Sequence, residues 1–282
     1  MGYELGVIGN PIKHSLSPWI HGQFMEMAEV EGRYLPYEIQ EEQLEERISE
    51  FKLMKMDGFN VTIPYKEKIM ELIDEVEESA KSIGAVNTVV YKNGKLIGYN
   101  TDGKGYISSL KNSYPDLFDQ TGDKKVLMIG AGGAARGIYD ALNREGFTMI
   151  DIANRTLERA EKIRSIKQPD VDTTILSLQK AEENISKYDL IVQTTNIGMT
   201  PDVGLMPIEL QNIRNNTVIS DIIYNPIETK FLQTAKKKGA RIHYGHGMLL
   251  YQAALAFELW TGQKVDPSNL LERLEQKLKG GS

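Results

Sequence analysis

Short apolar runs alternate along the chain with longer segments in which apolar residues recur at helical spacing. Such runs predict buried strands, and the longer segments predict amphipathic helices. Strands are expected at 3–9, 34–39, 58–63, 87–91, 95–99, 126–129, 148–153, 189–194, 218–222 and 241–244. Helices are expected from 17, at 41–56, at 66–82, from 102, from the glycine-rich 130–137 to about 145, and at 157–166, 248–260 and 269–278. This alternation is typical of an α/β fold with largely parallel sheets.

The alternation divides into two series. Asn93-Gly94 separates the runs 87–91 and 95–99, and this dipeptide favours a tight hairpin, so the first series contains an antiparallel pair. A second series begins at Lys124, after the turn-rich segment 114–123. We therefore expect two domains with a boundary between about 103 and 124, which agrees with the length of 282 residues.

Composition excludes several kinds of chemistry. The chain has no cysteine, which excludes disulfides, a thiolate nucleophile and cysteine-ligated metal sites. Its four histidines show no metal-ligand spacing, so no metal is expected. They are His14, His21, His243 and His246. A net charge of −6 argues against nonspecific nucleic-acid binding.

No targeting or membrane-spanning segment is predicted. The first ten residues carry neither a basic region nor a long apolar run, so we expect no signal peptide. The most apolar stretch, 248–260, is too short to span a bilayer. We expect a soluble, cytoplasmic protein with no membrane partner.

The most interpretable motif is the glycine-rich turn Gly130-Ala131-Gly132-Gly133-Ala134-Ala135. It follows an apolar strand, opens a helix and matches G-x-G-x-x-G/A. The first glycine permits a tight turn, the second lets a pyrophosphate approach the backbone, and the small third residue lets the helix pack closely on the strand. A simple packing turn is the alternative. The flanking strand and helix favour a dinucleotide site.

The next strand indicates which dinucleotide is bound. It ends in Asn154-Arg155-Thr156, with Arg159 one helical turn later, whereas the acidic Asp151 lies inside the strand. NAD-binding domains usually carry an acidic residue at the strand end, while guanidinium groups suit the 2′-phosphate of NADP. The alternative is that both arginines are merely solvated at a helix start. We expect NADP rather than NAD.

Polar residues in the first half cluster at the ends of predicted strands. They are Ser15, Ser17, Asn60, Thr62, Lys66, Asn87, Thr88, Asn100, Thr101 and Asp102. Ligands gather outside the carboxyl ends of parallel strands, and this mixture of groups suits a small polyhydroxylated acid. Each has a structural alternative, since Ser17 and Asp102 are ordinary helix caps and Asn87 is a common turn residue.

Taken together, these motifs resemble the shikimate dehydrogenase family, which includes shikimate/quinate dehydrogenases. The resemblance extends over nearly the whole chain, with the motifs in the family's order. They are Gly9-Asn10-Pro11, His14-Ser15-Leu16-Ser17-Pro18, Asn60-Val61-Thr62-Ile63-Pro64-Tyr65-Lys66, Gly84-Ala85-Val86-Asn87-Thr88, Asn100-Thr101-Asp102-Gly103, the glycine-rich turn, Asn154-Arg155-Thr156, Gly245-His246-Gly247-Met248-Leu249 and Gln252-Ala253-Ala254.

The resemblance implies two α/β domains with a cleft between them. Residues 1–103 would form a substrate domain with a mixed sheet, to which 245–282 would return. Residues 104–244 would form a Rossmann-type, doubly wound NADP domain. The implied reaction is the reversible NADPH-dependent reduction of 3-dehydroshikimate to shikimate, a step of aromatic amino acid biosynthesis.

The resemblance also implies roles for individual residues. Those expected to bind substrate are Ser15, Ser17, Thr62, Lys66, Asn87, Asp102, Tyr224 and Gln252. Those expected to bind NADP are Gly130, Ala131, Gly132, Gly133, Ala134, Asn154, Arg155, Thr156, Arg159, Ile222, Gly245 and Glu78. Lys66 and Asp102 would be the catalytic pair, because a lysine can donate a proton to a developing alkoxide and remove it in the reverse direction.

Two alternatives stay open at this point. One is a quinate/shikimate dehydrogenase that uses NAD, and the other is an NADP-binding sensor without catalysis. Arg155 and Ser17 argue against the first, and the intact Lys66 and Asp102 argue against the second. We expect a monomer or a homodimer.

Overall fold

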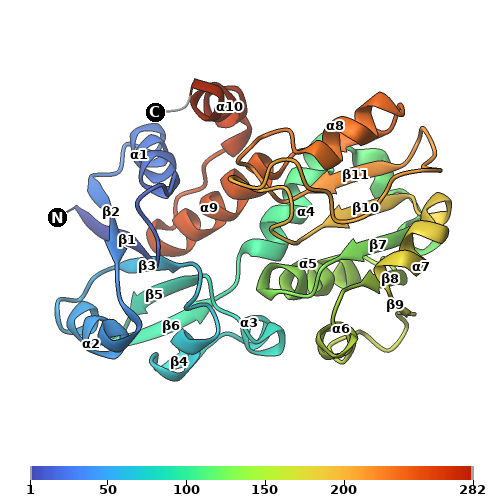
Figure 1. Ribbon diagram of the computed structural model, residues 1–282. Coiled ribbons are helices and arrows are strands. Elements are labelled where there is room, and N and C mark those ends of the chain that lie inside the picture. The colour runs from blue at the N-terminus through green and yellow to red at the C-terminus, as the bar shows by residue number, and fades with distance from the viewer. Residues whose placement is uncertain (1, 281–282) are drawn as a thin grey trace. The chain divides into compact units, whose positions relative to one another are not determined.

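The computed structural model describes residues 2–280, which form two compact α/β units (Figure 1). The first unit contains residues 2–102 and 250–267, and the second contains 103–249 and 268–280. Each unit has its own six-stranded sheet. The predicted class, two α/β units with one mixed and one parallel sheet, is confirmed. The C-terminal return to the first unit involves 250–267, whereas 268–280 groups with the second.

The sheet of the first unit has the order β2-β1-β3-β5-β6-β4. Its strands are β1 (Tyr3–Gly9), β2 (Gly32–Glu38), β3 (Gly58–Val61), β4 (Glu75–Val76), β5 (Thr88–Lys92) and β6 (Lys95–Tyr99). β1 pairs in parallel with β2 and β3, while β5 runs antiparallel to β3 and β6. Asn93 and Gly94 both have positive φ, 53° and 81°, as the predicted two-residue hairpin requires.

Helices cover both faces of this sheet, and Figure 1 shows α1 (Ser17–Met27) and α2 (Leu44–Leu53) on opposite sides of it. Successive side chains of β3 point to opposite faces of the sheet, and Phe59 and Val61 point into the core under α2. The other face carries stacked aromatic rings, including His21 on Tyr34 with ring centroids 4.3 Å apart. Trp260 from α9 (Gly245–Thr261) joins them. The first unit also contains α3 (Glu78–Ile83), η1 (Glu41–Gln43) and η2 (Lys68–Glu71).

The helix predicted over 66–82 is wrong. This segment forms η2, the short strand β4 and α3 instead. β4 pairs with β6 through Glu75 opposite Ile97, and the Asp74 carboxylate accepts the Leu96 N–H at 2.7 Å. The Glu77 carboxylate then accepts the first free N–H groups of α3. Asp74 thus bonds a strand backbone, and Glu77 makes α3 begin anew at Glu78, so one continuous helix over 66–82 does not form.

The sheet of the second unit has the order β12-β11-β10-β7-β8-β9, with every pair parallel. Its strands are β7 (Lys125–Ile129), β8 (Met149–Ala153), β9 (Ile175–Leu176), β10 (Leu190–Gln193), β11 (Val218–Asp221) and β12 (Arg241–His243). Apart from the two-residue β9, which is too short to show a periodicity, all were predicted to within a few residues. The predicted parallel, Rossmann-type arrangement is confirmed.

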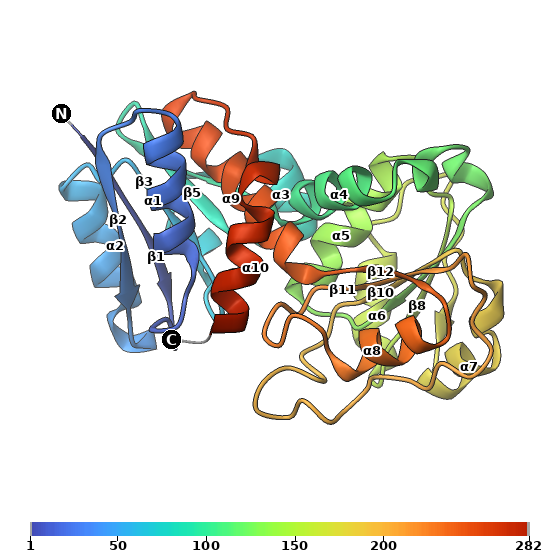
Figure 2. The same ribbon diagram turned by 90° about the horizontal axis from the view of Figure 1, so that it is seen from above.

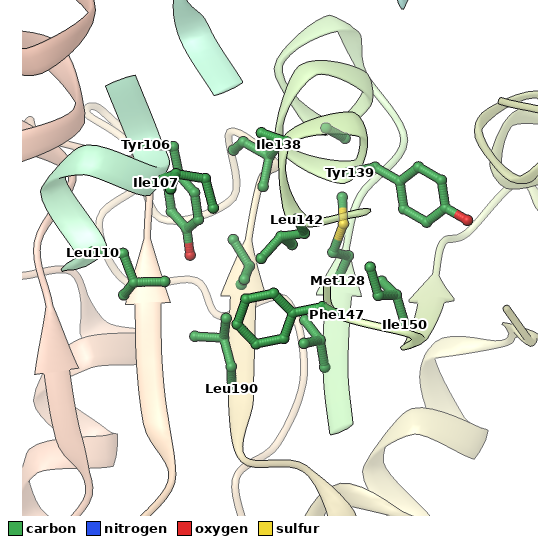
Figure 3. Close-up of a cluster of buried hydrophobic side chains, with 14 of the residues drawn as sticks. Tyr106, Ile107, Leu110, Met128, Ile138, Tyr139, Leu142, Phe147, Ile150 and Leu190 are labelled. Carbon is green, nitrogen blue, oxygen red and sulfur yellow. The ribbon is translucent and has the colours of Figure 1, made fainter. Parts of the chain in front are cut away.

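Two helical layers sandwich this sheet, and Figure 2 shows α4 (Asp102–Ser113) and α5 (Gly133–Arg144) on one side with α7 (Leu178–Glu183) and α8 (Lys230–Lys237) on the other. Figure 3 shows part of the core under the first layer, where Ile138 and Leu142 of α5 meet Met128 of β7. α7 and α8 were not predicted. The remaining helices are α6 (Leu157–Arg164), α10 (Leu271–Gly280), η3 (Pro115–Phe118), η4 (Thr121–Asp123), η5 (Ile185–Lys187) and η6 (Pro267–Leu270).

Two glycines of the first unit provide a matched test of its packing. A Cβ at Gly58 would lie 2.2 Å from the Trp260 Nε1 atom and 2.6 Å from the Val89 carbonyl oxygen, which this indole N–H bonds at 2.9 Å. Gly58→Ala should lower the free energy of unfolding by about 1–3 kcal/mol. Gly22 lies within α1 with no atom within 4 Å of its Cβ position, so Gly22→Ala should raise it by about 0.5–1 kcal/mol. Urea unfolding of both variants measures this, and equal shifts would contradict it.

Candidate active site

Polar side chains gather at one edge of the first sheet, where β3 and β6 end and β5 begins. Asn60 at the end of β3 lies opposite Thr88, and Thr88 lies opposite Tyr99 at the end of β6. Because β5 is antiparallel to both neighbours, its first residue stands beside residues at their carboxyl ends. The sheet thus brings together Asn60 and Tyr99, which are 39 residues apart in sequence.

An ion pair joins Lys66 to Asp102 at this edge. The Lys66 Nζ atom lies 2.5 Å from the Asp102 Oδ2 atom, and the two side chains are only 21% and 7% exposed. The Asn87 Nδ2 atom donates to the other carboxylate oxygen at 2.8 Å. The Asp102 N–H in turn donates to the Asn100 side chain at 3.1 Å. The carboxylate therefore has a charged partner on one oxygen and an amide donor on the other.

Backbone bonds hold the segments that carry this pair. The Lys66 carbonyl accepts the Val86 N–H at 2.8 Å, which joins the turn after β3 to the residue before Asn87. The Asn87 N–H donates to the Tyr99 carbonyl at 3.0 Å, close to Asp102 in the chain. Three short segments are thus linked where their side chains meet.

The structure brings some predicted substrate residues into direct contact and leaves others apart. Gln252 of α9 joins the cluster, since its Oε1 atom lies 3.4 Å from the Asn87 Nδ2 atom. Ser15 and Ser17 lie in the loop after β1 and at the start of α1, where the Ser15 hydroxyl accepts the Ser17 N–H at 3.3 Å. No hydrogen bond found within residues 2–280 joins the side chains of Ser15, Ser17 or Thr62 to the Lys66–Asp102 pair.

The second unit contains the predicted glycine-rich turn between β7 and α5. Gly130 has φ +113°, and a Cβ there would lie 2.5 Å from the Thr194 Oγ1 atom, so only glycine fits without strain. Gly132 precedes α5, and the Cβ positions of Gly132 and Gly133 have no atom within 4 Å. The first N–H groups of the twelve-residue helix α5 therefore have no side chain over them, and a ligand can approach the backbone closely. This arrangement fits a pyrophosphate.

The end of β8 presents cationic side chains. Arg155 and Arg159 are exposed, and neither guanidinium forms an ion pair within the described part of the chain. Asn154 bonds the Thr156 carbonyl through its Nδ2 atom at 2.6 Å and closes the turn. Asp151, the one acidic candidate for NAD, is buried and accepts the Tyr188 hydroxyl at 2.8 Å. It is therefore occupied inside the protein.

Ile222 and Gly245, both expected near the cofactor, lie against each other. A Cβ on Gly245 would lie 2.4 Å from the Ile222 carbonyl oxygen, so this approach requires glycine. Tyr224 follows in the same loop of the second unit, whereas Glu78 is an exposed residue at the start of α3 in the first unit. The roles proposed for Tyr224 and Glu78 stay predictions.

Sequence reasoning missed Asp221, the last residue of β11 and fully buried. Its carboxylate accepts the Ile223 N–H at 2.9 Å and the Thr229 hydroxyl at 2.7 Å, and so anchors the loop that contains Ile222. Burial raises the pKa of Asp221 to about 7, although both hydrogen bonds oppose the shift. A charged residue closing an apolar strand was the signal that could have identified it.

Two of the four histidines, His21 and His243, are buried, and burial makes their neutral form the stable one. Burial lowers the pKa of His21 to about 3 and that of His243 to about 4. The His243 ring bonds the hydroxyls of Ser109 and Ser220 at 2.9 and 2.8 Å, inside the second unit. Across residues 2–280, no group of three acidic, histidine or cysteine side chains is arranged to hold a metal ion, and no helix has the length and apolar character needed to cross a membrane.

Comparison with known proteins supports this arrangement of motifs. Three family models match the chain: the shikimate dehydrogenase substrate binding domain at residues 7–89, shikimate/quinate 5-dehydrogenase at 114–222, and the shikimate 5′-dehydrogenase C-terminal domain at 245–275. The shikimate dehydrogenase (NADP⁺) of Oceanobacillus iheyensis is 49% identical over 281 residues, which cover 99% of this chain and 100% of the relative. The chain belongs to the shikimate dehydrogenase family.

Solved structures support the family assignment. Shikimate 5-dehydrogenase of Thermus thermophilus, solved with NADP(H) and shikimate, has a TM-score of 0.86 at 34% identity, with 98% of this chain and 99% of that chain covered. Quinate dehydrogenase of Corynebacterium glutamicum, solved with NAD, has a TM-score of 0.87 at 26% identity, with 97% and 98% covered. The shikimate dehydrogenase fold therefore extends over nearly the whole chain.

The raised pKa of Asp221 predicts a pH dependence of stability. The folded protein holds this proton up to about pH 7, whereas the unfolded chain releases it near 3.8. Folding therefore takes up a proton between these values, and Asp221 makes the fold less stable as the pH rises through this window. Asp221→Asn, which cannot ionise, should gain stability relative to the wild type from pH 4 to pH 8, measured as the difference in Tm.

A matched control is Asp116→Asn in the same unit. The Arg241 guanidinium lowers the pKa of Asp116, so this carboxyl stays ionised down to pH values below its ordinary range. The difference in Tm between Asp116→Asn and the wild type should stay constant between pH 5 and pH 8. A flat difference for Asp221→Asn over the same range would contradict the assignment of a buried, proton-binding carboxyl.

Proposed function

We propose that this chain catalyses the reversible, NADPH-dependent reduction of 3-dehydroshikimate to shikimate, with Lys66 as the acid–base group. The observation that carries the proposal is the ion pair of Lys66 with Asp102, 2.5 Å apart and steadied by Asn87. A half-buried ammonium with a fixed carboxylate partner can deliver a proton to one defined position. Membership of the family supplies the substrate class.

The residues of the second unit fit NADP. Gly132 and Gly133 leave open space before α5, and its N-terminal N–H groups suit the pyrophosphate. Arg155 and Arg159 are exposed at the end of β8 and suit a 2′-phosphate. When bound, NADPH supplies the hydride that adds to the substrate carbonyl carbon.

The side chains of the first unit supply the proton. In the reductive direction the Lys66 ammonium donates a proton to the carbonyl oxygen as it becomes an alcohol. In the oxidative direction the Lys66 amine removes the proton from the same hydroxyl. Asp102 holds the Lys66 Nζ atom in place through Oδ2, so that the proton leaves from a defined point.

The other polar groups orient the substrate in this proposal. Ser15 and Ser17 hold its carboxylate, at the start of α1 where hydroxyl donors are available. Thr62, Asn87 and Gln252 address its hydroxyl groups, and the Asn87–Gln252 contact supports a shared position for two of them. Tyr224 completes the proposed set. A cytoplasmic location and a monomeric or dimeric state remain predictions.

The two alternatives make different demands on the same site. A quinate dehydrogenase that prefers NAD needs an acceptor for the ribose 2′-hydroxyl, but Asp151 is occupied by Tyr188 inside the protein. A non-catalytic sensor has no need for a lysine held at hydrogen-bond distance from a carboxylate. Both observations favour an NADP-dependent enzyme.

Lys66→Ala should lower kcat at least about 100-fold, because a positioned acid–base group typically contributes a factor of this size or more. The affinity for NADPH, followed by fluorescence titration, should stay near that of the wild type. Lys68→Ala is the matched control, since Lys68 lies two residues away and forms an exposed ion pair with Glu41. This control should keep wild-type kcat.

The same assay tests the proposed activity itself. Wild-type protein should oxidise shikimate with NADP, and the absorbance of the reduced nicotinamide measures the rate. Tight binding of NADP without turnover would disprove the enzyme proposal in favour of the sensor. Equal losses of NADPH affinity and kcat in Lys66→Ala would show instead that Lys66 is structural.

Arg155→Ala should weaken the binding of NADP more than that of NAD, because only NADP carries the 2′-phosphate. A charge-assisted bond of this kind contributes about 1.5–3 kcal/mol, so the Kd for NADP should rise at least about tenfold. Arg164→Ala is the control, because Arg164 lies on α6 and pairs with Glu161 on the same helix. Titrations that show equal losses for the two cofactors would contradict the assignment.

A further inference from the structure

A row of buried hydrogen bonds connects Asp102 to Tyr34, a residue that neither the motifs nor the family comparison single out. The row passes through Asn87, Thr88 and Asn60. All five side chains are buried, the most exposed at 7%. The row lies wholly within the first unit.

The direction of each bond follows from groups that can only donate or only accept. The Thr101 N–H donates to the Asn87 Oδ1 atom at 2.8 Å, so the Asn87 Nδ2 atom must face Asp102. The Asn60 Nδ2 atom donates to the Asn87 backbone carbonyl at 3.1 Å, which orients the second amide. Neither amide can flip without losing a bond.

The two hydroxyls are then oriented by the amides. The Asn60 Nδ2 atom donates to Thr88 Oγ1 at 3.1 Å, so the single Thr88 proton points to the Asn87 Oδ1 atom, 2.9 Å away. The Tyr34 hydroxyl donates to the Asn60 Oδ1 atom at 2.7 Å. Burial raises the pKa of Tyr34 well above its ordinary value, with the Ser17 side chain opposing the shift, so the phenol keeps its proton.

Every donor in this row therefore points the same way, from Tyr34 toward the Asp102 carboxylate. Aligned hydrogen bonds in a dry interior polarise one another, so each strengthens the next. The last link, from Asn87 to Asp102, fixes the carboxylate oxygen opposite the one that holds Lys66. The row thus acts on the position of Asp102 from the side opposite Lys66, and its far end at Tyr34 lies outside the proposed substrate-binding set.

We propose that Tyr34 is a positioning residue for the reaction, acting through Asn60, Thr88 and Asn87 on the Lys66–Asp102 pair. The inference rests on the proposed function, since it assigns a role in that same site. Tyr34 adds no group to the substrate pocket. It orders the amide of Asn87 so that Asp102 holds Lys66 in the geometry for proton transfer.

Tyr34→Phe removes only the hydroxyl and keeps the ring stacked on His21. The expected result is a fall in kcat of about tenfold, with KM for shikimate and the Kd for NADPH within about twofold of wild type. Tyr139→Phe is the matched control, since it also removes one buried hydroxyl bond, to Thr173 in the second unit, and should keep wild-type kcat. The Tm of both variants should fall by a similar amount.

A double-mutant cycle separates this role from simple stabilisation. Thr88→Val keeps the side-chain shape and breaks the row in its middle. If Tyr34 acts through Thr88, adding Tyr34→Phe to Thr88→Val should lower kcat by less than twofold, whereas its effect on Tm should persist. Additive losses in kcat would overturn the proposal.

Two further results would overturn it. One is an unchanged kcat in Tyr34→Phe with a lowered Tm, which would mean a purely structural hydroxyl. The other is a raised KM for shikimate at unchanged kcat, which would mean that Tyr34 acts through Ser17 on substrate binding. Failure of the proposed function is distinguishable, because it would appear as a wild-type protein without turnover.

Discussion

The need to hold a nearly buried carboxylate in place, paired with a lysine, governs the first unit. Asp102 and Lys66 are largely withdrawn from water, and such a pair is stable only when its remaining hydrogen-bonding capacity is satisfied. Asn87 supplies a donor to the free carboxylate oxygen, and Asn100 accepts the Asp102 N–H. A hydrophobic replacement of the pair would pack well but could not perform the proton transfer that we propose for Lys66. The surrounding structure is therefore arranged to satisfy polar groups at one sheet edge.

The antiparallel strand β5 provides that arrangement. If β5 were parallel to β3 and β6, its first residue would lie at the opposite edge of the sheet, away from Lys66 and Asp102. The Asn-Gly hairpin reverses the chain and brings Thr88 beside Asn60 and Tyr99. The second unit brings its loops together in a different way. All its strands are parallel, so their carboxyl ends lie at the same edge of the sheet. There Gly130 and Asp221 shape the loops after β7 and β11.

Much of this was predictable because it depends on local sequence. Strand and helix periodicity, the Asn-Gly turn and the glycine-rich turn each arise from neighbouring residues, and the structure contains them. The wrong or missed predictions concern residues whose hydrogen-bond partners are distant in the sequence. The segment 66–82 has helical spacing, but Asp74 bonds the backbone of β6 and draws the chain into the sheet edge. Tyr34 and Asp221 were missed because their roles depend on bonds to Asn60 and Thr229, whose positions only the folded chain defines.

Register links the stability of the first sheet to the geometry of its site. Along β3, Phe59 and Val61 fill the core under α2, so Asn60 faces the aromatic side with Tyr34. A slip of one residue would reverse these faces, remove Phe59 from the core under α2 and break the bonds of Asn60 to Tyr34 and Thr88. The apolar residues that bury the sheet therefore also select the one pairing in which the donors align. Hydrophobic packing at Phe59 and the proton transfer proposed for Lys66 then depend on the same register, and through that register the distant Tyr34 is connected to the Lys66–Asp102 pair.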